Sequence, residues 1–160
     1  MISITVSIDT SAGTLSWTDL EKADESVRRD LSQRNWYGQL NLDLDDDEGL
    51  VLVDDLDGLT MGICVMAIPA LARGERVEIP SRTSKELAVL EVDQKVVQVI
   101  DPSGDSLRFP LRDFCRAALL CADSYLAQVE LLRGDAGRRF ADAYRPELEK
   151  AREALKELDR

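Results

Sequence analysis

The spacing of apolar residues changes near Pro110, and this change constrains the fold more than any other feature of the sequence. Before Pro110, apolar residues recur at every second position in several short segments, which is the period of a half-buried β-strand. After it they recur at every third or fourth position over two long segments, which is typical of amphipathic helices. We therefore expect an α+β fold with a mainly antiparallel sheet, a helix in the N-terminal half, a buried middle helix and long C-terminal helices.

The predicted strands lie between the N-terminus and Pro110. Ile2, Ile4, Val6 and Ile8 alternate with polar residues and predict the first strand. A β-hairpin is predicted from Trp36 to Asp54, with a turn at Asp47-Glu48-Gly49 and a more fully buried returning strand at residues 50–53. The remaining predicted strands are 76–80, 86–92, 96–100 and 107–109.

Four segments are candidates for helices. Residues 17–33 carry an apolar stripe that follows possible N-caps at Ser16 and Thr18, which predicts one amphipathic helix. Residues 58–72 contain no charged side chain; their end is typical of a buried helix, whereas their first half is compatible with helix or strand. Long helices are predicted from Pro110 to Gly134 and over 135–160, where Pro146 could break the second one near Arg145.

These segments suggest how the chain is divided into domains. A length of 160 residues suits one domain with a substantial core. We expect residues 1–134 to form a single α+β domain. Residues 135–160 are expected to be a helical extension that packs either on this domain or on a partner.

Negative charge is concentrated in one part of the chain. The net charge is −11, from 20 Lys and Arg against 31 Asp and Glu, and residues 35–72 hold eight acidic side chains and no basic one. This balance argues against binding to nucleic acid, where phosphate contacts need clustered basic residues, and against docking on anionic lipid. We expect a protein partner with a basic surface, because a dense patch of one sign speeds encounter and selects by complementarity. The alternative is an acidic rim that serves only solubility.

The candidate contact surface is this acidic hairpin together with two aromatic residues at its start. Aromatic side chains at a rim are good interface anchors, although they can equally pack on the core. A calcium loop is disfavoured, because the glycine falls at the seventh position and strands rather than helices flank the segment. The candidate partner-binding residues are Trp36, Tyr37, Asp43, Asp45, Asp46, Asp47, Glu48, Asp54, Asp55 and Asp57.

The composition excludes several kinds of catalysis. The chain has no histidine, so a Ser-His-Asp triad, a Cys-His pair and histidine-ligated metal sites are ruled out. Its three cysteines are odd in number and lie within apolar stretches, which favours core packing and a reducing compartment. No segment has the apolar length of a membrane-spanning helix. We expect a cytoplasmic protein that is not an enzyme and that uses no cofactor or metal.

In general character the chain resembles small bacterial immunity proteins of toxin–immunity systems. The resemblance rests on the acidic hairpin from Leu40 to Asp57 and on two further runs, Pro69-Ala-Leu-Ala-Arg-Gly-Glu-Arg-Val-Glu-Ile-Pro80 and Phe109-Pro-Leu-Arg-Asp-Phe-Cys-Arg-Ala-Ala-Leu119. It implies a protein that binds a cognate toxin and occludes its active or substrate-binding surface. A second resemblance, to type III secretion chaperones, implies a homodimer that binds an effector. The chain departs from these chaperones by opening with a strand and by its extra C-terminal helix.

Overall fold

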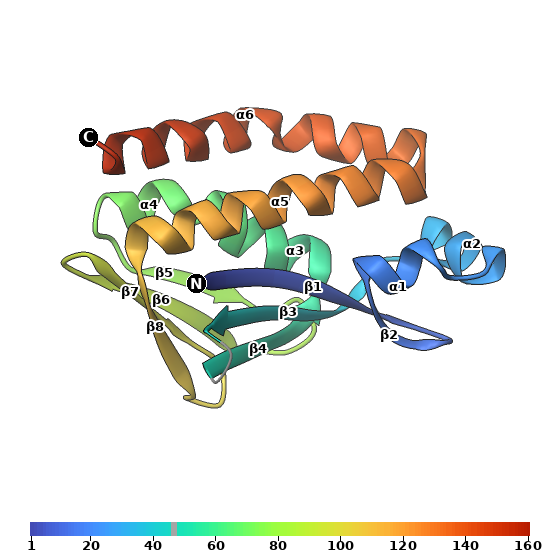
Figure 1. The fold of residues 1–160 in the computed structure, drawn as a ribbon, viewed down its shortest axis with the longest axis horizontal. Helices are drawn as coiled ribbons and strands as arrows, with labels where there is room; N and C mark the ends of the chain where they lie inside the picture. Colours follow the sequence, from blue (N-terminus) through green and yellow to red (C-terminus); the bar gives the residue numbers. More distant parts are fainter. Residues whose placement is uncertain (46–47) are drawn as a thin grey trace.

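The structure is a computed structural model that describes residues 1–45 and 48–160. The described residues form two antiparallel four-stranded sheets with helices above them (Figure 1), so the α+β prediction is confirmed. The first sheet has the order β2-β1-β3-β4, built from β1 (Ile2–Thr10), β2 (Gly13–Ser16), β3 (Tyr37–Leu44) and β4 (Glu48–Asp55). The second is a meander of β5 (Val77–Pro80), β6 (Leu87–Asp93), β7 (Val96–Ile100) and β8 (Ser106–Pro110).

Strand β4 begins earlier than the sequence predicted. Glu48 and Gly49 belong to β4, where they pair with Leu44 and Asp43, so the predicted turn at 47–49 is wrong for these two residues. Asp47 lies outside the described residues. The extended register keeps Leu50 and Leu52 on the buried face, which accounts for the shift.

The N-terminal helical segment is two helices rather than the single helix predicted over 17–33. The first, α1 (Trp17–Glu21), begins at Ser16 with a capping box in which the Ser16 and Asp19 side chains bond each other's backbone N–H groups. The second, α2 (Glu25–Gln33), begins at Asp24, whose carboxylate accepts a hydrogen bond from the Val27 N–H at 3.1 Å. The cap at Asp24 restarts the helix and accounts for the break.

The remaining helices are α3 (Leu56–Met61), a π-helical turn η1 (Gly62–Met66), α4 (Ile68–Ala72), α5 (Leu111–Arg133) and α6 (Asp135–Leu158). The uncharged block at 58–72 is therefore helical apart from a turn at Ala67, and its first half is helix rather than strand. Pro146 lies on the exposed side of α6 without ending it, so the predicted break near Arg145 does not occur. Gly134 separates α5 from α6 with a φ of 61°, a value that a residue with a side chain rarely adopts.

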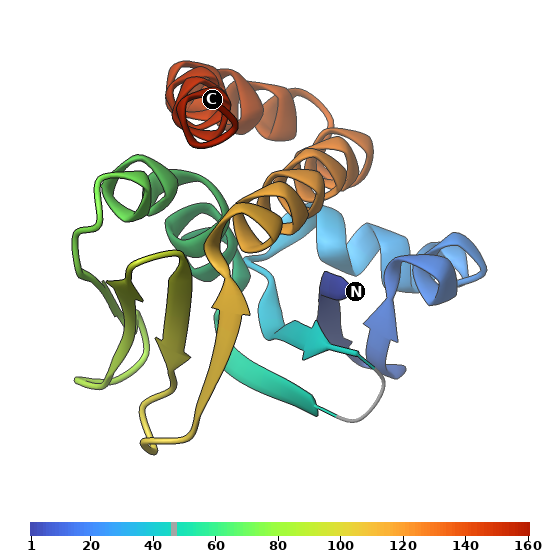
Figure 2. The ribbon, with the colours of Figure 1, turned by 60° about the vertical axis from the view of Figure 1, so that its left-hand side comes forward.

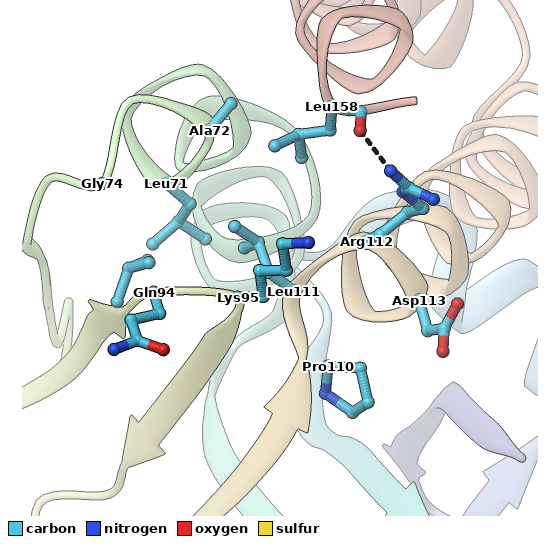
Figure 3. A pocket seen from close by; sticks show the side chains of 11 residues that line it. Leu71, Ala72, Gly74, Gln94, Lys95, Pro110, Leu111, Arg112, Asp113 and Leu158 are labelled. Atoms are coloured by element: carbon cyan, nitrogen blue, oxygen red, sulfur yellow. Dashed lines mark hydrogen bonds between the residues drawn. The ribbon is translucent and has the colours of Figure 1, made fainter. Parts of the chain in front are cut away.

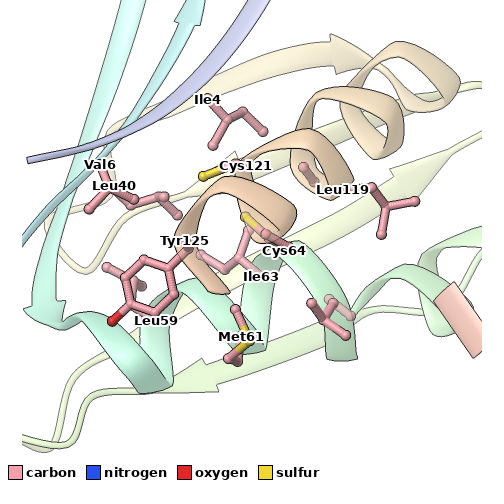
Figure 4. Close-up of a cluster of buried hydrophobic side chains, with 14 of the residues drawn as sticks. Ile4, Val6, Leu40, Leu59, Met61, Ile63, Cys64, Leu119, Cys121 and Tyr125 are labelled. Carbon is pink, nitrogen blue, oxygen red and sulfur yellow. The ribbon is translucent and has the colours of Figure 1, made fainter. Parts of the chain in front are cut away.

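The helices cover one face of the first sheet (Figures 1 and 2). Helix α5 packs on β1 and η1, and α6 lies on α5 and α4 through buried Ala141, Leu148 and Ala151. Side chains of β1, β3, η1 and α5 meet between these layers (Figure 4), including Ile4, Leu40, Ile63 and Cys121. The opposite face of β1, β3 and β4 carries no helix within the described chain (Figure 2), which leaves it open to a partner.

Candidate functional site

The structure divides the predicted contact residues into a surface set and an internal set. Tyr37, Asp43, Asp45 and Glu48 lie at the surface of the β3–β4 hairpin, whereas Trp36, Asp54, Asp55 and Asp57 are largely buried and have partners within the chain. Asp46 and Asp47 lie outside the described residues. The acidic hairpin is therefore not one continuous surface.

Trp36 is a core residue, which corrects its expected place at an exposed rim. Its side chain is 0% exposed, and its indole N–H donates a hydrogen bond to the Leu31 carbonyl at 2.8 Å. The Trp17 and Tyr125 rings lie 6.3 and 5.5 Å from its ring. A large apolar ring next to a strand is buried here because α1, α2 and α5 converge above it.

Asp57 is held inside the protein by a bidentate ion pair. The two carboxylate oxygens accept hydrogen bonds from the Arg133 guanidinium at 2.9 and 3.1 Å, and the Tyr125 hydroxyl also donates to Asp57. The Arg133 guanidinium stacks 4.3 Å above the Trp36 ring. Burial, and then the adjacent Asp57 charge, raise the pKa of Tyr125 well above its ordinary value. Asp57 therefore joins α3 to α5, and its carboxylate is already occupied by partners within the chain.

Asp54 and Asp55 organise the junction between β4, α3 and the loop after β5. Asp55 caps α3 by accepting a hydrogen bond from the Gly58 N–H at 3.0 Å, and the Arg82 guanidinium lies 3.8 Å from the same carboxylate. Asp54 is 8% exposed and accepts a hydrogen bond from the Arg82 backbone N–H at 3.3 Å. Both carboxylates hold local structure, so a change at either one would disturb the fold as well as any interface.

The side chains that project from one side of β3 and β4 define a surface, which we call the outer face. It combines the exposed Tyr37, Val51 and Val53 with the half-buried Gln39, Asn41 and Asp43. In the sheet register Gln39 lies opposite Val53 and Asn41 opposite Val51, so these side chains project from the same side. Val51 and Val53 are 47% and 52% exposed, and Tyr37 is 38% exposed. The outer face thus combines three exposed apolar side chains with an acidic end.

Sequence reasoning missed the two valines, because the run from Leu50 to Val53 is typical of a strand buried on both faces. The signal that identifies them is the partner strand. Gln39 and Asn41 are polar, and pairing them with Val53 and Val51 places these valines on the solvent side.

At the acidic end of the hairpin, Asp43 lies on the outer face, whereas Glu48 projects to the opposite side, that of Leu50 and Leu52. These carboxylates have few internal partners. Asp45 accepts a hydrogen bond from the Met1 amino group at 2.6 Å, but no Lys or Arg lies within ion-pair distance of Asp43 or Glu48 in the described part of the chain. Unneutralised carboxylates of this kind are available to a basic partner. Asp43 and Glu48 therefore replace the wider acidic cluster as the charged part of the candidate site.

The three cysteines are buried in the core, and two of them lie close together (Figure 4). A hydrogen bond with Cys121, together with complete burial, raises the pKa of Cys64 well above its ordinary value. Burial raises the pKa of Cys115 to about 12. Because the thiolate is the reactive form, these thiols are poor nucleophiles at neutral pH. Residues 1–45 and 48–160 also contain no cluster of three or more His, Cys, Asp or Glu side chains that could hold a metal ion.

The second candidate site is a cavity of about 380 Å³ where the β6–β7 turn meets α4 and the ends of α5 and α6 (Figure 3). Its walls are mostly apolar, with Lys95 and Arg112 at the rim. The Arg112 guanidinium donates a hydrogen bond to the Leu158 carbonyl at 2.6 Å and pairs with Asp159 at 3.1 Å. Arg112 thus ties the end of α6 to the start of α5, which is a structural task.

Comparisons with protein-family models, with curated proteins and with solved structures gave no match to this chain. Among the described residues, no helix has the length and apolar character needed to cross a membrane.

Proposed function

We propose that this protein is a non-enzymatic binding protein, an immunity protein that neutralises a cognate bacterial toxin in the cytoplasm by occluding its active or substrate-binding surface. The observation that carries the proposal is the outer face, where exposed apolar side chains share one side of the sheet with the unneutralised Asp43 carboxylate, and where Glu48 lies at the same end of the hairpin on the other side. Tyr37, Val51 and Val53 are the apolar anchors. Asp43 and Glu48 orient a partner with a basic surface.

The physical argument joins burial with charge. Anchors carry most of the binding energy when a partner covers them and excludes water, and strands hold them with little entropy to lose. The carboxylates add to the rate of encounter and to selectivity more than to affinity, and salt screens their effect. Occlusion of a toxin needs no catalytic group in the binding protein, which suits a chain whose three cysteines are all buried.

The test has two steps: to establish whether a gene adjacent to this one encodes a toxin domain, and to measure whether this protein neutralises that domain. Co-expression should restore growth, and the purified pair should form a stoichiometric complex. Replacing both Val51→Ser and Val53→Ser should weaken the affinity at least tenfold, because two anchors are lost. Leu87→Ser, which changes a residue of similar exposure on the second sheet, is the matched control and should leave the affinity unchanged. A folded double variant with unaltered affinity would remove the outer face from the proposal.

The charged end is tested by salt dependence. Asp43→Asn with Glu48→Gln should slow association and flatten its dependence on salt, while Asp142→Asn on α6 should change neither. Asp55 and Asp57 are unsuitable for this test, because they cap α3 and pair with Arg133. If the partner were instead held partly unfolded by a homodimer, the protein would be a secretion chaperone and the proposal would fail.

A further inference from the structure

Strand β1 has a neighbour on both sides along only half of its length. It pairs with β3 from Ile2 to Ile8, but with β2 only from Ser7 to Thr10. Within residues 1–45 and 48–160, no strand pairs with residues 2–5 on the side away from β3. Half of this strand is thus a sheet edge, although β1 lies inside the order of the sheet.

The direction of the backbone groups on this edge follows from the register. The Asp45 N–H donates to the Met1 carbonyl at 3.1 Å, which makes Met1 and Asp45 a hydrogen-bonded pair. Such pairs alternate in an antiparallel ladder, so Ser3 and Thr5 direct their backbone groups toward β3. Ile2 and Ile4 therefore direct their N–H and C=O groups away from β3. We call these four groups the open edge.

The open edge lacks the features that usually protect an edge strand. Proteins prevent unwanted pairing with Lys, Pro, bulges or a covering segment. Residues 2–6 contain no Lys, Pro or Gly, and their ladder with β3 is regular. An apolar groove of about 650 Å³ lies between this part of β1 and α5, and its lining includes Ile2, Ile4, Ala117 and Leu120. Leu120 is 70% exposed although it is a leucine in the middle of a helix.

We propose that the open edge receives an extended segment of the partner protein as an additional strand, with apolar side chains in the groove and Lys or Arg on the solvent side. The inference rests on the proposed function for the existence of a partner protein. An added strand would satisfy all four backbone groups of the open edge, and its inward side chains would cover Leu120. Ser3 pairs with Asp43 in the sheet, so outward basic side chains opposite Ser3 would reach toward that carboxylate.

Charge decides between a partner segment and a second copy of the chain. Each copy carries a net charge of −11, so two copies repel each other on approach. A basic extended segment is attracted to the acidic chain as a whole and to Asp43 beside Ser3, while Arg116 in the wall of the groove is already paired with Asp113 and Asp159. The occupant is therefore assigned to another protein.

The probe is a synthetic heptapeptide, acetyl-Lys-Val-Lys-Val-Lys-Val-Lys-amide, titrated against the full chain. Valines opposite Ile2 and Ile4 would direct their N–H groups at the open edge, whereas the lysine N–H groups would point away. N-methylation of the three valines should therefore weaken binding about tenfold or more, and N-methylation of three lysines should have little effect. Equal loss with both peptides would overturn the proposal.

Hydrogen exchange measures the same edge in the protein. In the free chain the Ile4 amide should exchange faster than the Thr5 amide, which bonds to β3, and the peptide should slow Ile4 selectively. Peptide binding that leaves Ile4 exchange unchanged would place the peptide elsewhere and refute the proposal.

Two variants test the edge and the groove separately. Ile2→Pro removes one outward N–H at the start of the strand, and Ile2→Val is its control. Leu120→Glu places a charge in the groove, and Leu131→Glu changes a residue of equal exposure elsewhere on α5. Ile2→Pro and Leu120→Glu should each weaken peptide binding several-fold. If both variants fold and bind the peptide as tightly as the unchanged protein, the proposal is overturned. It is also overturned if the protein forms a homodimer that persists at high salt and that Leu120→Glu dissociates.

The same variants separate this proposal from the proposed function. If the toxin is neutralised and only the outer-face variants impair binding, the open edge is not used although the protein is an immunity protein. If the peptide binds as described and no toxin is neutralised, the edge is a strand-addition site and the immunity function is wrong.

Discussion

Removal of the Asp57 carboxylate should destabilise the fold more than removal of any exposed acidic side chain. Asp57 and Arg133 are 13% and 12% exposed, and breaking one side of a buried pair costs about 3–5 kcal/mol. Because some water reaches both side chains, we take the lower end, about 3 kcal/mol. The hydrogen bond from the Tyr125 hydroxyl adds about 1 kcal/mol. Asp57→Ala should therefore lose about 4 kcal/mol of unfolding free energy.

The assay is urea unfolding followed by far-ultraviolet circular dichroism, since Trp36 lies against Arg133 and its fluorescence would change with the mutations themselves. A double-mutant cycle with Asp57→Ala and Arg133→Met isolates the interaction, and we expect a coupling energy of about 2 kcal/mol. Asp57→Asn keeps the shape of the side chain and serves if the alanine variant does not fold.

The control is the exposed pair of Asp142 and Arg145 on α6. Its atoms are 2.7 Å apart, closer than the 2.9 Å of the internal pair, but its side chains are 57% and 66% exposed. Asp142→Ala should cost less than about 1 kcal/mol. If the coupling energy of the internal pair also fell below about 0.5 kcal/mol, burial would not set the strength of this ion pair and the reasoning would be refuted.

Three further changes test the packing, the thiols and α6. A methyl group at Gly137 would lie 2.2 Å from the Val129 carbonyl oxygen, so Gly137→Ala should separate α5 from α6. The free energy of unfolding, measured in urea, should fall by about 1–3 kcal/mol. An unchanged urea midpoint would contradict this close approach. Burial raises the pKa of Cys115 to about 12 in the folded state, whereas the unfolded thiol has a pKa of about 9. Between these pH values the unfolded chain loses a proton that the folded chain keeps. The free energy of unfolding should therefore fall as pH rises, by up to about 1.4 kcal/mol per pH unit. Cys115→Ala should flatten this dependence, measured by unfolding under reducing conditions at pH 8 to 10, and an equally steep loss would assign it to other groups. Pro146→Ala should restore a helical N–H and raise the unfolding free energy by about 1–3 kcal/mol, and a lower thermal midpoint would show that the proline is needed.

The sequence predicts the elements of this fold better than their ends. Alternation in Ile2 to Ile8 and the long stripe after Pro110 identify β1 and α5, because both elements bury one face against the core. The break between α1 and α2 was missed, because an apolar stripe is compatible with a cap at Asp24 that interrupts the backbone. The predicted break at Pro146 is absent, because the buried side chains of Leu148 and Ala151 hold the helix on the C-terminal side of the proline.

The candidate site was predicted as a region rather than as a set of residues. A count of acidic side chains treats Asp43 and Asp57 alike, although one faces solvent and the other pairs with Arg133, 76 residues away in sequence. The three-dimensional contacts that separate them are long-range and leave no local pattern. Val51 and Val53 were hidden for a related reason, since the exposure of a strand residue depends on the strand beside it.

The alternation along β4 has an evolutionary consequence. Leu50 and Leu52 are almost completely buried, so selection for stability restricts them to residues of similar volume. Val51 and Val53 are exposed and are not restricted in volume, so substitutions at these positions change the surface with little effect on the stability of the fold. Adjacent codons of one strand are therefore expected to be under different selection. Under the proposed function, substitution of every second residue of a single hairpin would change the partner that the protein recognises.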